Sequence, residues 1–276
     1  MRKKHSNLIL VLVLLVGLSI LAYPIVSDWV NAKNQSHLIA DYSKAVESID
    51  DAGYEALFAA AGQYNRALLE KPYRWLLSDE ELAAYNEILD VTGNGVMGYV
   101  EIPCISVFLP VFHGANRDVL QVAAGHVEGS SLPVGGESTH SVISAHRGMP
   151  SSKLFTDLDQ VELGDIFTFS LLNRTLAYEV DQILVVLPQE LEALEIEEGQ
   201  DYFTLVTCTP YGVNSHRLLV RGHRIETAEE AGVIRITADA VRIDPLLVAA
   251  CIAAPVLALL FIIALCAPAP KRRIDL

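Results

Sequence analysis

The hydrophobic pattern of this sequence is dominated by two long apolar runs, one near each end of the chain. No Asp, Glu, Lys or Arg occurs in residues 5–27 or in residues 245–270. A helix of about 20 apolar residues crosses the roughly 30 Å hydrocarbon core of a bilayer, and core helices of soluble domains are seldom that long without a charge. We therefore expect two transmembrane helices, one within residues 1–30 and one at residues 245–270.

Basic residues beside both runs predict how the chain is oriented in the membrane. Arg2, Lys3 and Lys4 precede the first run, and a basic tail at residues 271–276 follows the second. By the positive-inside rule both ends are cytoplasmic, so the residues between the two runs face outward from the cell membrane. A cleaved signal peptide is the alternative for the first run, but that run is long and lacks a convincing small-x-small cleavage site.

Residues 31–92 have a helical pattern and form a linker and lid segment. Apolar residues recur at three- and four-residue spacing from residue 35 to residue 70. A Lys-Pro-Tyr sequence at residues 71–73 ends this helical pattern. Ser78, followed three residues later by Glu81, is typical of the capping box that begins another short helix.

Residues 93–228 change to short apolar or alternating segments separated by turn residues. Evenly spaced strands of this kind indicate a closed barrel or a sandwich, so the fold class is mainly β. Residues 119–124 fit either a helical turn or a strand, and residues 190–198 could form a helix between strands. Residues 229–244 are expected to link this domain to the second apolar run. The expected strands are residues 97–102, 107–112, 141–145, 166–171, 176–187, 202–207 and 218–225.

The charge and the motif content exclude several classes of function. The formal net charge is −14 at pH 7, and an acidic surface repels phosphate backbones, so we expect no nucleic-acid partner. A partner that presents lysine fits this charge better. No His, Cys or carboxylate pair has the tight spacing of a zinc or calcium site, and no glycine-rich phosphate loop occurs.

Two of the four cysteines lie in the outward-facing part of the chain, Cys104 and Cys208. A disulfide between them is one reading, because paired cysteines outside the cell are usually oxidised. The surroundings of Cys208 favour a reactive thiol instead. An expected strand ends at this cysteine, a Thr-Pro pair follows, and the next strand returns from Arg217. A guanidinium beside Cys208 would favour the thiolate and could bind an oxyanion.

A thiolate mechanism needs an acid/base group, for which histidine is the usual residue near neutral pH. His146 ends the expected strand at residues 141–145 and is followed by Arg-Gly. His126 follows a similar apolar stretch that ends in glycine. The residues alone do not decide which of the two histidines is the acid/base. Either could instead be a structural loop histidine held by hydrogen bonds.

Four stretches of the sequence resemble the sortase family, and most closely its class C, the pilin-polymerising branch. The most specific is Thr207-Cys208-Thr209-Pro210 within residues 204–222. The others are residues 94–103, 125–133 and 144–148. The similarity spans roughly residues 93–224, and two membrane anchors also suit class C.

The resemblance implies an eight-stranded β-barrel in which Cys208, His146 and Arg217 are the catalytic nucleophile, acid/base and charge stabiliser. His126 would then belong to a neighbouring loop. Such enzymes cleave a Leu-Pro-x-Thr-Gly-like sorting signal between Thr and Gly. They pass the acyl group to a lysine amine of a second pilin and need no cofactor. A housekeeping sortase that anchors surface proteins to peptidoglycan is the alternative within the family.

The sequence departs from the class C pattern at the lid, a segment that covers the groove in such enzymes. The usual Asp-Pro-aromatic motif is replaced by Lys71, Pro72 and Tyr73. We expect Pro72 and Tyr73 to form the lid, with Tyr73 plugging the groove, but no carboxylate at residue 71 can pair with Arg217. Asp79 is a possible substitute on the same segment.

Overall fold

The computed structural model describes the backbone of residues 2–225 and the side chains of residues 13–225. The chain divides after Val26 into two units, which are described separately. The second apolar run at residues 245–270, the linker at 229–244 and the basic tail at 271–276 all lie outside the described residues.

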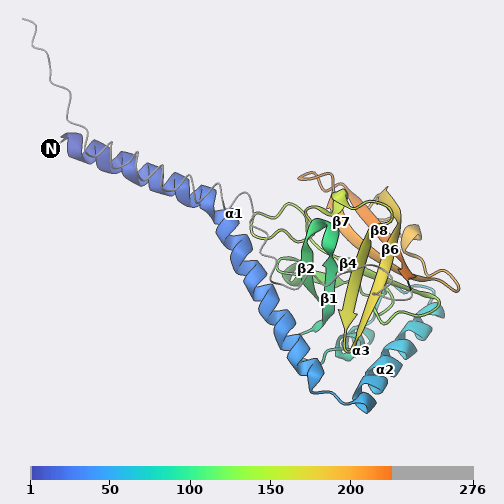
Figure 1. The fold of residues 1–276 in the computed structure, drawn as a ribbon. Helices are drawn as coiled ribbons and strands as arrows, with labels where there is room; N and C mark the ends of the chain where they lie inside the picture. Colours follow the sequence, from blue (N-terminus) through green and yellow to red (C-terminus); the bar gives the residue numbers. More distant parts are fainter. Residues whose placement is uncertain (1, 226–276) are drawn as a thin grey trace, which may run out of the picture. The chain divides into compact units, whose positions relative to one another are not determined.

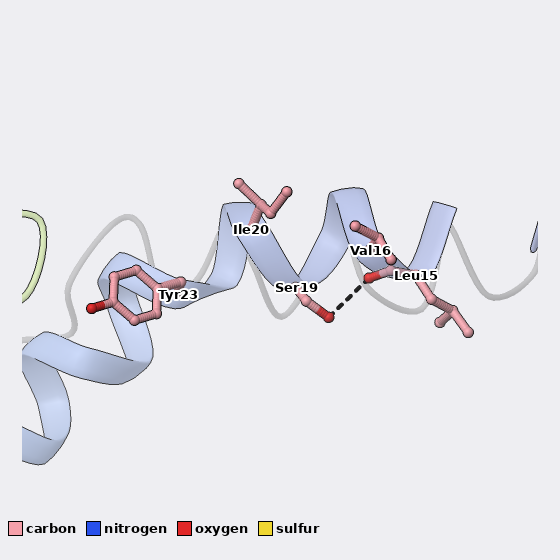
Figure 2. Close-up of a pocket in the computed structure, with 5 residues that line it drawn as sticks. All are labelled: Leu15, Val16, Ser19, Ile20 and Tyr23. Carbon is pink, nitrogen blue, oxygen red and sulfur yellow. Dashed lines mark hydrogen bonds between the residues drawn. The ribbon is translucent and has the colours of Figure 1, made fainter. Parts of the chain in front are cut away.

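The first unit contains the N-terminal part of α1 (Arg2–Glu47). One helix in the described part of the chain is long and apolar enough to cross a membrane, and none of its apolar window is buried. Figure 2 shows Leu15, Val16 and Ile20 projecting from it. The Ser19 hydroxyl turns back to donate to the Leu15 carbonyl at 2.9 Å, so its polar group is satisfied within the helix. This surface fits a membrane anchor.

Two further helices complete the segment before the barrel. The helical pattern predicted for residues 35–70 is confirmed but divides in two, because Asp50 caps the start of α2 (Asp51–Leu69) by accepting from the Gly53 amide at 2.8 Å. The predicted capping box is also confirmed, with Ser78 and Glu81 at the start of α3 (Asp79–Glu87). α1 runs without a break through residue 30.

Eight strands close into a barrel in the order β1-β2-β3-β4-β7-β8-β6-β5 (Figure 1). β2 pairs with β3, and β4 with β7, in parallel, whereas the other pairs are antiparallel. The strands are β1 (Val96–Ile102), β2 (Val107–His113), β3 (Ala124–His126), β4 (Thr139–Ser144), β5 (Ile166–Leu171), β6 (Arg174–Val186), β7 (Asp201–Thr209) and β8 (His216–Ile225).

Seven of these strands match the predicted segments, and the eighth, β3, begins at the last residue of the ambiguous stretch at residues 119–124. The short helix α4 (Arg117–Leu120) takes up the start of that stretch. The helix considered for residues 190–198 is reduced to one 3₁₀ turn (Glu192–Leu194). Two other 3₁₀ turns, Pro103–Ile105 and Leu158–Gln160, lie in connections between strands.

The two faces of β7 have different roles. Phe203 and Leu205 point into the barrel and are fully buried in the main core. Val206 points outward, where it joins a second apolar cluster on the outer face of the sheet, called here the outer cluster. Its buried members are Val142, Leu194, Val206 and Leu219, and Trp75, Val127, Leu184, Val186, Leu191 and Ala193 pack against them.

Two buried histidines are held neutral by burial, and each has hydrogen-bond partners that fit the neutral ring. His126 Nε2 donates to the Ser131 carbonyl at 2.8 Å, and Nδ1 accepts from the Tyr85 hydroxyl at 2.7 Å. His140 Nδ1 donates to the Glu195 carbonyl at 2.8 Å. Loss of hydration on burial lowers the pKa of His126 to about 3 and that of His140 to about 4.

We therefore predict that the fold loses stability as the pH falls from 6.5 towards 5. In the unfolded chain each imidazole takes up a proton near pH 6.5, whereas in the folded chain both stay neutral, so acid favours the unfolded state. Each histidine should cost about 1.4 kcal/mol of unfolding free energy per pH unit below 6.5. Thermal unfolding at pH 7, 6 and 5 measures this. His140→Gln, which cannot titrate, should flatten the dependence, and an unchanged pH dependence would contradict it.

Candidate active site

The pairing of three neighbouring strands brings the predicted catalytic residues into one row. Cys208 on β7 is the direct antiparallel partner of Arg217 on β8. On the other side of β7, Ser144 at the end of β4 is the parallel partner of Val206. Hydrogen bonds from Ala145 N to Val206 O (3.1 Å) and from Thr207 Oγ1 to Ala145 O (2.9 Å) carry this pairing beyond β4. His146 is therefore level with Cys208, as Arg217 is.

Residues level with one another on paired strands project from the same face of a sheet. Because Val206 is in the outer cluster, alternation along β7 puts Cys208 on the outer face as well. Cys208, His146 and Arg217 are all half-buried. The row thus lies beside the outer cluster, with a thiol, an imidazole and a guanidinium accessible from one side of the barrel.

The Arg217 guanidinium is bound only by backbone carbonyls in the hydrogen bonds and ion pairs of the described residues. Nη1 donates to the carbonyls of Asn214 (3.3 Å) and His216 (3.1 Å), and no carboxylate pairs with it there. Within residues 13–225, no acidic side chain neutralises its positive charge. An anion that forms at Cys208 can therefore compete for this guanidinium.

His146 is held by the loop that follows it, residues 147–157. Its carbonyl accepts a hydrogen bond from the Phe155 amide at 3.1 Å. A Cβ at Gly148 would lie 2.9 Å from the ring of Tyr211, so this loop touches the β7–β8 loop closely. Partial burial lowers the pKa of His146 below its ordinary value, which favours the neutral imidazole, the form that accepts a proton.

The other candidates lie outside this row. His126 is fully buried and does not reach the row's outer face. Cys104 and Cys208 are both free thiols, so no disulfide joins them. Desolvation and the neighbouring Asp165 raise the pKa of Cys104 to about 11, which makes its thiol a poor nucleophile. Arg221 forms a bidentate ion pair with Asp181, with distances of 3.0 and 2.9 Å.

The lid segment differs from the prediction for Tyr73. Pro72 is exposed and the Tyr73 side chain is 74% exposed, so it does not plug an apolar groove. Trp75 is the aromatic residue that packs on the outer cluster. Asp79 is exposed at the start of α3 and makes no ion pair with Arg217 among the described residues.

Arg74 and Trp75 were not predicted as site residues. Arg74 is buried, donates to the Leu194 carbonyl at 2.7 Å, pairs with Glu195 at 3.2 Å and stacks on Trp75 with its guanidinium carbon 4.3 Å from the ring centre. Tryptophan is the largest apolar side chain, and that size is a signal in the sequence that could have indicated residue 75.

No cluster of side chains suited to a metal ion occurs in the part of the chain whose side chains are described.

Comparisons with known proteins point to one family. A sortase domain model matches residues 100–225. Sortase A of Bacillus anthracis is 24% identical over 227 residues, covering 82% of this chain and 97% of that protein. Sortase A of Streptococcus agalactiae is 27% identical over 137 residues. That match covers 49% of this chain and 55% of the length of the relative.

Solved structures are more similar. Crystal structures of sortase C1 from Streptococcus agalactiae and sortase C-1 from Actinomyces oris are 49% and 44% identical to this chain. They cover 69% and 63% of it and are themselves covered to 99%, with TM-scores of 0.67 and 0.58. The chain belongs to the sortase family of cysteine transpeptidases. Within that family it is a class C sortase.

Proposed function

We propose that this protein is an extracytoplasmic pilin polymerase, which cleaves a Leu-Pro-x-Thr-Gly-like sorting signal and joins the acyl fragment to a pilin lysine. The observation that carries the proposal is the row of His146, Cys208 and Arg217 on one outer face of the barrel. A nucleophile, an acid/base and a cation at one level are the groups that acyl transfer requires.

The first half of the reaction forms a thioester. The Cys208 thiol gives its proton to neutral His146, and the resulting thiolate attacks the carbonyl of the signal's threonine, whose oxygen becomes an oxyanion. The guanidinium of Arg217, whose hydrogen-bond partners in the structure are carbonyls, turns to this oxyanion. His146 as imidazolium protonates the departing glycine amine, and the thioester remains on Cys208.

The second half transfers the acyl group. The incoming lysine amine loses a proton to the now neutral His146 and attacks the thioester carbonyl. The tetrahedral intermediate collapses, the isopeptide bond forms and the Cys208 thiolate leaves. The lowered pKa of His146 suits this proton acceptance near neutral pH. The proposed reaction uses no cofactor.

Pilin polymerisation, rather than anchoring to peptidoglycan, is supported by the class C relatives. The Streptococcus pneumoniae sortase C structure is described as giving insight into pilin substrate specificity, and it is 46% identical and 97% covered by this chain, with a TM-score of 0.63. An acidic outer domain also suits a lysine-bearing acceptor. We propose a location at the cell membrane, held by α1 and by a second span at residues 245–270.

Substitution of the row should separate its three roles. Cys208→Ala should abolish cleavage of a sorting-signal peptide without lowering the melting temperature. Arg217→Lys keeps the charge but not the planar fork, so kcat/KM should fall by about 10²–10³-fold. His146→Ala should be comparably slow. Peptide cleavage and pilin ligation, followed by mass spectrometry, measure all three. Ligation by the Cys208→Ala protein would overturn the proposal.

We propose that the lid segment, residues 71–77, limits access to Cys208 through Trp75. Trp75 covers the outer cluster beside the row, and Arg74 fixes it there through Leu194 and Glu195. The indole N–H is buried without an acceptor among the described residues, and that cost favours release. Pro72 and Tyr73 then form the exposed turn of the lid.

Removing the ring should therefore speed modification of the nucleophile. Trp75→Ala should raise the rate at which a bulky thiol reagent alkylates Cys208 by up to about tenfold, if closure is worth about 1.4 kcal/mol. Tyr73→Ala is the matched control, since that ring is already in solvent, and should leave the rate unchanged. Peptide mapping of Cys208 gives the rate. Equal rates for wild type and Trp75→Ala would mean that the segment does not restrict access.

A further inference from the structure

Three polar side chains of α1 bind backbone groups of the barrel. Asp28 Oδ1 accepts from the Lys153 amide at 2.7 Å, Asn31 Nδ2 donates to the Ser151 carbonyl at 2.6 Å, and Gln35 Nε2 donates to the Val122 carbonyl at 2.7 Å. Residues 28, 31 and 35 are three and four positions apart, so they lie on one face of the helix. This polar stripe comes directly after the apolar run.

The groups that the stripe binds flank the strand that leads to His146. Ser151 and Lys153 belong to residues 147–157, the loop that follows His146. Val122 precedes β3, which pairs with β4 through Gly125 and Ser144. The stripe therefore contacts one segment after the catalytic histidine and another beside its strand.

The 147–157 loop connects the residues bound by the stripe to His146 over a few residues. Lys153 is two residues before Phe155, whose amide holds the His146 carbonyl. Phe155 is fully buried, so this end of the loop is fixed in the core. The Lys153 ammonium also donates to the Ile105 carbonyl at 3.1 Å. The tip of the loop includes exposed Pro150, and the stripe binds next to it.

Simple packing does not require polar residues at these positions. The same face of α1 continues with Ile39, Tyr42 and Val46, which are buried. Apolar side chains therefore suffice to dock the helix further along. Polar side chains in the same place lose hydrogen bonds to water when the helix docks. That cost in free energy is offset only if each donor meets an acceptor in one particular geometry.

We propose that Asp28, Asn31 and Gln35 are positioning residues, which hold the 147–157 loop so that His146 stays level with Cys208. This inference rests on the proposed function and deepens it, because the helix that leaves the apolar run becomes part of the catalytic apparatus. Loosening the stripe should leave peptide binding intact and slow the proton transfers at His146.

The test uses the full chain in detergent and two matched pairs of variants. Asn31→Ala is compared with Asn34→Ala, because Asn34 is exposed on the same helix. Asp28→Ala is compared with Asp28→Asn, which keeps the Oδ1 acceptor. Asn31→Asp replaces the donor with an acceptor that faces the Ser151 carbonyl. The readouts are kcat and KM for a sorting-signal peptide, the pH dependence of Cys208 alkylation and the melting temperature.

We expect Asn31→Ala, Asn31→Asp and Asp28→Ala to lower kcat by roughly fivefold, the size of one lost hydrogen bond, with KM unchanged. The pH dependence of Cys208 alkylation should shift in the same variants. Asn34→Ala and Asp28→Asn should match wild type.

Equal kcat and equal pH profiles in all five variants would overturn the inference, as would a fall in melting temperature without a kinetic change. A wild-type protein that leaves the peptide uncleaved would instead contradict the proposed function. The alkylation profile still tests the stripe in that case.

Discussion

The parallel pairing of β4 with β7 is the constraint on which the site depends. It sets His146 level with Cys208, although the two residues come from strands far apart in the sequence. A slip of one residue would turn one side chain to the opposite face of the sheet. The register is fixed by burial on both faces, since Phe203 packs inside the barrel and Val206 packs outside. β8 then adds Arg217 by antiparallel pairing.

The outer face of this sheet is therefore both a packing surface and the surface on which we propose that the reaction takes place. The outer cluster next to the row is covered by Trp75 and by the loop that contains Leu194. Arg74 joins the two through hydrogen bonds and an ion pair. On the other side, the polar stripe of α1 contacts the loop after His146. The helical segment before the barrel thus makes two contacts near the site, one through Trp75 on the outer cluster and one through α1 on the loop after His146.

Local patterns predicted much of this structure, and non-local contacts account for the rest. Alternation gave seven strands, and the Ser78 capping box gave α3, because both signals lie within a few residues. Antiparallel return of the next strand also pointed to Cys208 beside Arg217. The residues alone left His146 and His126 open, and the resemblance to sortases favoured His146. Its position level with Cys208 depends on the parallel pairing of β4 with β7, which no short pattern encodes. Tyr73 was predicted to plug the groove and Trp75 was missed, because an irregular segment has no period that assigns its faces.

We propose that Cys208 carries the acyl group, and trapping the intermediate tests this most directly. The full chain is incubated with a sorting-signal peptide in the absence of an acceptor amine, quenched in acid and mapped by mass spectrometry. The expected product is the peptide fragment ending at threonine as a thioester on Cys208, released by hydroxylamine. Cleavage of the peptide with no adduct on Cys208, or with the adduct on another residue, would contradict it.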